Sequence, residues 1–161
     1  MKLNSDGCCK GNPGNGGGGS ILRDDTGQVI FAHADFYDDT TNYIAEAKAL
    51  LQGLHICKTR GMDHIDIEVD SLMLQQIICR RIATPWAIAY EIRQIETILR
   101  QIDYSISHVY RENNRAADFL ANWGFKVRKF VVLQHMNIPR KLVGIVRIDR
   151  SGLKSVRVPK M

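Results

Sequence analysis

The last quarter of the sequence has very little negative charge. Residues 124–161 hold ten lysines and arginines but a single acid, Asp149, whereas residues 1–123 carry a net charge of −4. An acidic body followed by a basic end favours a polyanionic partner such as a nucleic acid, although basic segments also serve plain solubility. The charge pattern therefore predicts a domain over residues 1–124 and a basic C-terminal extension over residues 125–161.

The sequence also lacks long apolar runs, a hydrophobic leader and paired cysteines. No stretch approaches the roughly 18 apolar residues that cross a bilayer, and residues 1–10 contain no leader-like segment. The four cysteines lie at positions 8, 9, 57 and 79, without the spacing of a zinc site. We therefore expect free thiols and an intracellular protein, nuclear or cytoplasmic and not secreted, with no membrane partner.

Hydrophobic periodicity predicts an α/β fold. With 161 residues and 45% hydrophobic composition, the chain has the size and apolar content of one domain. The predicted strands cover residues 3–10, 16–23, 29–36, 64–70 and 104–109. The predicted helices cover residues 42–60, 72–82, 88–102 and 114–123, with weaker signals for a strand at 130–133 and a helix at 139–148. We expect a five-stranded mixed sheet, an antiparallel meander plus parallel strands, flanked by helices.

Polar residues and glycine mark the expected ends of these helices. Asn42 and Ser71 stand where the first two helices begin, and Asn113 or Asn114 precedes the last one. Gly124 is expected to end that last helix, since glycine readily adopts the left-handed conformation that follows many helices.

Four acids lie where a core-building sequence avoids them. They are Asp6 inside the first strand, Glu46 beside the apolar stripe of the first helix, Asp70 at the end of the fourth strand, and Asp118 among small apolar residues of the last helix. One such acid is ordinarily a solvated cap, but four on different core elements indicate a shared site. Carboxylates brought together repel each other unless cations neutralise them, and oxygen ligands suit magnesium or manganese.

The order and spacing of these residues resemble the type 1 ribonuclease H family. The resemblance rests on Asp6-Gly7, the glycine-rich stretch that starts at Gly11, Glu46, Val69-Asp70-Ser71, and His108 ten residues before Asp118. It covers residues 4–124 and looks most like the reverse-transcriptase-like RNase H domain of plant non-LTR retroelements and their domesticated descendants. It implies an RNase H-like fold, with residues 1–124 as the catalytic domain.

The resemblance implies a metal-dependent endonuclease that hydrolyses the RNA strand of RNA/DNA hybrids. Two Mg²⁺ or Mn²⁺ ions would act on the scissile phosphate. The residues that match the family's metal-binding carboxylates are Asp6, Glu46, Asp70 and Asp118, and His108 matches its mobile histidine. Substrate contacts are implied for Asn12 and Asn42, in the minor groove of the hybrid, and for Thr41, near a DNA phosphate.

The sequence departs from bacterial members of the family at two places. Leu72 replaces a polar contact residue, and residues 80–89 are too short and too poor in lysine for the basic protrusion that grips DNA in those proteins. The basic extension is expected to compensate through phosphate contacts, which weaken steeply with salt.

Two other functions stay open. A domesticated domain can lose its chemistry and remain as a catalytically silent nucleic-acid-binding or adaptor module, and another nuclease or strand-transfer enzyme could use the same fold. Residues 14–19 formally satisfy the dinucleotide-binding pattern G-x-G-x-x-G, but a strand rather than a helix follows them. We therefore expect no small-molecule cofactor, and we expect the glycines to permit close approach of the backbone to substrate. We also expect a monomer.

Overall fold

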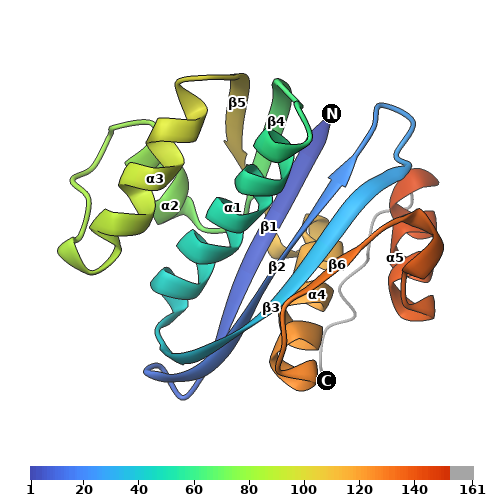
Figure 1. The fold of residues 1–161 in the computed structure, drawn as a ribbon, viewed down its shortest axis with the longest axis horizontal. Coiled ribbons are helices and arrows are strands. Elements are labelled where there is room, and N and C mark those ends of the chain that lie inside the picture. Colours follow the sequence, from blue (N-terminus) through green and yellow to red (C-terminus); the bar gives the residue numbers. More distant parts are fainter. Residues whose placement is uncertain (153–161) are drawn as a thin grey trace, which may run out of the picture.

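The structure is a computed structural model that describes residues 1–152. Its elements follow the expected order of a strand meander and then alternating helices and strands (Figure 1). The strands are β1 (Lys2–Lys10), β2 (Gly14–Arg23), β3 (Val29–Thr40), β4 (His64–Val69), β5 (Asp103–His108) and β6 (Val131–Leu133). The helices are α1 (Asn42–Thr59), α2 (Leu72–Ile78), α3 (Ala89–Leu99), α4 (Arg115–Val127) and α5 (Arg140–Arg150). Three cations of the basic extension, Lys154, Arg157 and Lys160, lie outside the described residues.

Within residues 1–152 one sheet has the strand order β5-β4-β1-β2-β3-β6. The meander β1-β2-β3 is antiparallel, whereas β4 runs parallel to both β1 and β5. The expectation of five strands is wrong by one, because β6 adds a sixth. Residues 131–133 pair with residues 32–34 of β3 and so cover what would otherwise be an exposed sheet edge.

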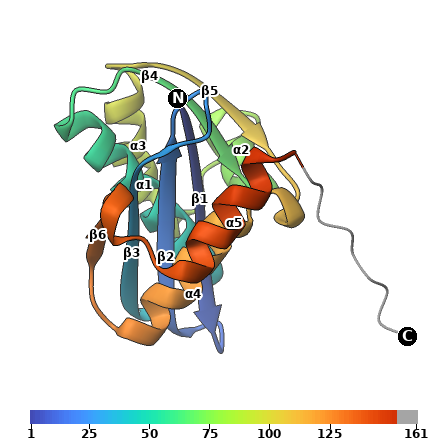
Figure 2. The ribbon, with the colours of Figure 1, turned by 90° about the vertical axis from the view of Figure 1, so that its right-hand side faces the viewer.

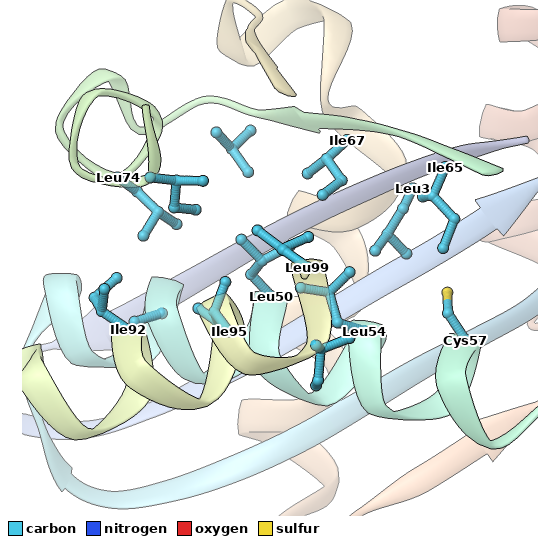
Figure 3. Close-up of a cluster of buried hydrophobic side chains, with 14 of the residues drawn as sticks. Leu3, Leu50, Leu54, Cys57, Ile65, Ile67, Leu74, Ile92, Ile95 and Leu99 are labelled. Carbon is cyan, nitrogen blue, oxygen red and sulfur yellow. The ribbon is translucent and has the colours of Figure 1, made fainter. Parts of the chain in front are cut away.

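Helices cover both faces of the sheet (Figures 1 and 2). On one face α1, α2 and α3 enclose the larger apolar cluster, in which Leu3 of β1 and Ile67 of β4 lie close to Leu50 and Leu54 of α1 (Figure 3). On the other face α4 lies across β1, β2 and β3, and its Leu120 packs in a second cluster. No helix within residues 1–152 is long and apolar enough to cross a membrane.

The first part of the basic extension packs onto the domain. Leu142 and Val146 of α5 are buried in the second cluster. An ion pair of 2.8 Å joins the Arg23 guanidinium of β2, which is 8% exposed, to the Asp149 carboxylate of α5. Together with the pairing of β6, these contacts make the segment up to residue 150 a structural part of the fold.

Several expected helix ends differ in the structure. The side chain of Thr41, not that of Asn42, caps α1 by accepting a hydrogen bond from the Ile44 amide at 3.3 Å. The second helix ends at Ile78, four residues before the expected Ile82, whose side chain is exposed. With Ile82 outside the core, hydrophobic periodicity overestimated the helix length. Ser71 caps α2 as expected.

The last helix runs past Gly124 to Val127. A Cβ at Gly124 would lie 2.3 Å from the Asp35 carbonyl oxygen, so this glycine lets α4 touch β3 rather than ending the helix. Arg128, in the left-handed conformation, follows the end of α4 instead.

The glycine-rich part of β2 serves the same packing. A Cβ at Gly17 or Gly19 would lie 2.3–2.4 Å from atoms of Ala121 and Leu120. Gly17 and Gly19 therefore let α4 pack closely against β2, and the expected close approach of the glycine-rich stretch to substrate stays a prediction.

Candidate active site

Three of the four expected carboxylates converge. One oxygen from each of Asp6, Glu46 and Asp70 lies within 4.8 Å of the others. They come from three separate elements: β1, α1 and the residue that follows β4. Asp6 is only 6% exposed, and Glu46 and Asp70 are partly buried. This cluster is the centre of the candidate site.

The sheet register and one glycine explain this convergence. Because β1 and β4 run parallel with Ser5 opposite Val69, Asp6 in the middle of β1 lies next to Asp70, the residue that directly follows β4. The carboxyl end of a parallel strand, where Asp70 stands, is a common place for functional side chains in α/β folds. Gly7 lets α1 approach β1 at this point, since a Cβ there would lie 2.4 Å from the Glu46 backbone nitrogen.

Asp118 lies near the cluster but does not join it. Its Oδ1 accepts a hydrogen bond from Arg111 at 3.1 Å, and Asn122 donates to its backbone oxygen at 2.9 Å. The charge of Asp118 nevertheless raises the pKa of both Asp6 and Asp70, which places it within electrostatic reach. The structure therefore brings three of the expected carboxylates together and holds the fourth beside them on an arginine.

Burial and mutual repulsion perturb the cluster. Burial, followed by the charges of Asp70, Asp118 and Glu46, raises the pKa of Asp6 far above its ordinary value. Burial first and then Asp70 raise the pKa of Glu46 to about 7. The pKa of Asp70 is also raised, chiefly by burial. Few surrounding charges neutralise this group of acids: within residues 1–152, Arg111 is the only cation that forms an ion pair with Asp118 or with a member of the cluster.

The donor set fits a hard divalent cation. All converging atoms are carboxylate oxygens, the ligands that magnesium and manganese prefer. The side chains of Asp6, Glu46 and Asp70 would hold such an ion, and its charge would offset the mutual repulsion that adds to burial in raising their pKa values.

A cavity of about 430 Å³ opens over the cluster. Asn12 and Asn42, which were expected to contact substrate, both line this cavity. The side-chain oxygen of Asn12 accepts a hydrogen bond of 3.1 Å from the backbone N–H of Asn42. Thr41 does not line this cavity, and its hydroxyl caps α1 instead. The structure thus places two of the three expected substrate residues at the site and gives the third a structural role.

His108 lies behind the cluster. Its Nε2 donates a hydrogen bond of 3.1 Å to the backbone oxygen of Asp70, and its ring meets Tyr110 edge-on. The histidine is therefore next to the site, but it does not line the cavity in this conformation.

Sequence reasoning missed several polar residues around the site. Lys10, Arg111 and Asn122 line the cavity. The position of Asn122 at the site could have been predicted, because it follows Asp118 by one helical turn. Nothing in the sequence indicated that Arg111 lies there. Asn114 was expected to cap α4, but its side chain bonds Asn4 and the Ser5 backbone oxygen and makes no cap.

A second, larger cavity of about 600 Å³ lies away from the carboxylate cluster. Charged side chains line it, and four of them form ion pairs with each other, Arg23 with Asp149 and Lys2 with Glu68. The smaller cavity is the better candidate site, because its acids lack such partners.

The chain resembles known ribonucleases H in sequence. Over 129 residues it is 31% identical to an Arabidopsis thaliana protein named for ribonuclease H, covering 79% of this chain and 21% of that protein. Over 119 residues it is 32% identical to ribonuclease HI of Halobacterium salinarum, covering 73% of this chain and 60% of that enzyme. The chain therefore spans less than two thirds of either relative.

Solved structures have the same fold. The crystal structure of RNase H1 from Halobacterium salinarum matches 78% of this chain and 97% of its own, with a TM-score of 0.75 and 28% identity. LC11-RNase H1 in complex with an RNA/DNA hybrid matches 78% of this chain and 96% of its own, with a TM-score of 0.72 and 24% identity. The sequence model of the family described as reverse transcriptase-like matches residues 4–124. The match over residues 4–124 and the likeness to RNase H1 structures agree with the strand order, so the chain belongs to the reverse transcriptase-like family and has the RNase H fold.

Proposed function

We propose that the carboxylate cavity hydrolyses the RNA strand of RNA/DNA hybrids with bound divalent cations. The convergence of Asp6, Glu46 and Asp70 from three elements carries this proposal, because core elements otherwise avoid unneutralised acids. The relatives named ribonuclease H support the reaction, and the neighbour that holds an RNA/DNA hybrid supports the substrate class.

Each group at the site has a part in the proposed reaction. Two Mg²⁺ or Mn²⁺ ions, when bound, supply an activated water and neutralise charge on the scissile phosphate. Asp6, Glu46 and Asp70 hold that positive charge in place, and Arg111 keeps Asp118 beside them. The protein thus contributes fixed charges and positioning rather than a covalent intermediate.

Polar residues at the cavity rim can orient the nucleic acid. Asn12 and Asn42 offer amide groups that can bond sugar hydroxyls, the feature that distinguishes RNA from DNA. Lys10 adds a positive charge at the same rim and can contact a phosphate.

A cleavage assay tests the proposal. The chain is incubated with a labelled hybrid, an RNA duplex or a DNA duplex, each with magnesium, manganese or a chelator. We expect cutting of the hybrid's RNA strand alone, none with chelator, and a rate about a hundredfold or more lower for Asp70→Asn. Asp66→Asn is the matched control, because this exposed carboxylate of β4 bonds Ser105 away from the site.

Two results would contradict the proposal in different ways. Equal cutting of the RNA duplex would indicate another nuclease on the same fold. Binding of the hybrid without cutting in either metal would instead indicate a catalytically silent binding module.

A further inference from the structure

A groove of about 280 Å³ lies between α4 and the start of α5. Figure 2 shows α5 beside α4 on the face of the sheet opposite α1. One wall of the groove is a single face of α4, formed by Phe119, Asn122, Trp123 and Lys126 at helical spacing. The other wall is the segment 139–141 at the start of α5.

The groove combines aromatic surface with unopposed positive charge. Phe119 and Trp123 are partly buried, because they line the groove and also pack against the second apolar cluster. Lys126, Arg140 and Lys141 are exposed, and within residues 1–152 none of the three forms an ion pair with an acid. Residues 119–148 contain no aspartate or glutamate at all. This surface suits an anion that also carries a flat, stackable group.

The groove adjoins the carboxylate cavity. Asn122 lines both, and Lys10 of the cavity donates to its side-chain oxygen at 3.1 Å. Positive charge is thus present at the cavity, from Lys10, and at the adjoining groove, from Lys126, Arg140 and Lys141. A strand whose phosphate lies at the carboxylates can pass from the cation of the cavity to those of the groove.

We infer that this groove binds an unpaired nucleotide of the RNA strand where that strand runs past the end of the hybrid. The base stacks against Trp123, and its phosphates contact Lys126, Arg140 and Lys141. The groove is too small for a duplex, so its occupant is single-stranded. Because the strand held at the neighbouring carboxylates is the RNA strand, the unpaired nucleotide belongs to that strand. This inference rests on the proposed function, because that function decides which strand occupies the carboxylate cavity.

Binding measurements separate this groove from the chemistry. The full chain carrying Asp70→Asn, which is expected not to cut, is titrated with fluorescent hybrids at low salt. One hybrid is blunt, one has four unpaired nucleotides on its RNA strand, and one has them on its DNA strand. We expect the RNA extension to tighten binding about fivefold or more, since stacking one base contributes about 1–3 kcal/mol.

Two variants locate the effect. Lys126→Gln/Arg140→Gln/Lys141→Gln changes only exposed side chains and should abolish the advantage of the RNA extension, as should Trp123→Leu. Lys58→Gln/Arg93→Gln/Arg100→Gln removes the same charge from exposed sites on α1 and at α3, and should keep that advantage.

The outcomes distinguish the two proposals. Three results would overturn the inference about the groove: equal affinity for blunt and RNA-extended hybrids, tighter binding of the DNA-extended hybrid instead, or an equal loss of the RNA-extension advantage in both triple variants. If the unaltered chain still cleaves hybrids normally, the proposed function remains intact in each of these cases. Failure of the unaltered chain to cut any hybrid, with the RNA-extension advantage still present, overturns the proposed function alone.

Discussion

Replacing Gly7 by alanine should damage both the fold and the site, because β1 and α1 touch at this residue. The added Cβ would lie 2.3 Å from the Ala45 carbonyl carbon and 2.4 Å from the Glu46 nitrogen. Ordinary contact starts near 3.4 Å, so the helix must move by about 1 Å. Both close atoms are backbone, which cannot rotate away as a side chain can.

The expected cost follows from this geometry. Overpacking a core typically costs about 1–3 kcal/mol, and a backbone clash belongs at the upper end, about 3 kcal/mol in the free energy of unfolding. For a domain of this size, that lowers Tm by roughly 6–12 °C. A displacement of about 1 Å in Glu46 should also lower the cleavage rate by about a hundredfold in the molecules that remain folded.

Gly144→Ala is the matched control. A Cβ there meets no atom within 4 Å, and Gly144 lies inside α5, where alanine favours the helix by up to about 1 kcal/mol. Urea unfolding and hybrid cleavage are measured for both variants at a temperature where each is folded. A Gly7→Ala protein with the parent's unfolding midpoint and cleavage rate would refute the packing explanation of the site.

Three further substitutions test the fold around the site. Asn114→Ala removes two buried hydrogen bonds, one from the Asn4 side chain and one to the Ser5 backbone oxygen, so urea unfolding should show a loss of about 3 kcal/mol; a loss below about 0.5 kcal/mol would contradict the buried network. Asp149→Asn weakens the ion pair to the nearly buried Arg23, and should cost about 1–2 kcal/mol at low and high salt alike; strong screening by salt would contradict its burial. Burial lowers the pKa of His33 to about 3, below the 6.5 of the unfolded chain, so its contribution to the free energy of unfolding falls as pH drops below 6.5, by about 2 kcal/mol down to pH 5. The free energies of unfolding of the parent and of His33→Asn should therefore become more alike as pH falls, and a constant difference between them at every pH would contradict this.

The sequence predicts best those features that depend on local pattern. Alternation of Ile65, Ile67 and Val69 with acids predicted β4, and helical spacing of Leu50 and Leu54 predicted α1; both are confirmed. Spacing along these elements, together with the family resemblance, also led to the acids at positions 6, 46 and 70.

Features that depend on contacts between distant segments were missed. Gly124 has the signature of a helix end, but its backbone neighbour is Asp35 of β3, so the helix continues. Asn114 has the signature of a cap, but its partners are on β1, 109 and 110 residues away in the chain. The strand at 130–133 was itself predicted, but its place in the sheet was not, because it depends on an edge that only the assembled sheet exposes. Local propensity contains no information on these contacts.

The division after residue 124 stays a prediction about function rather than packing. Removing residues from 126 onwards would take away β6 and the buried Leu142 and Val146 along with the cations. Point substitutions in the groove are therefore a better test of the role of the basic extension than truncation.

The affinity of the full chain for Mn²⁺, measured by titration calorimetry without nucleic acid, tests the central claim most directly. The claim is that carboxylates from β1, α1 and the end of β4 hold divalent cations together. We expect Mn²⁺ to bind the parent and Asp66→Asn alike, and to bind Asp70→Asn at least about tenfold more weakly. Equal Mn²⁺ affinity in Asp70→Asn and the parent, or an equal loss in Asp66→Asn, would contradict it.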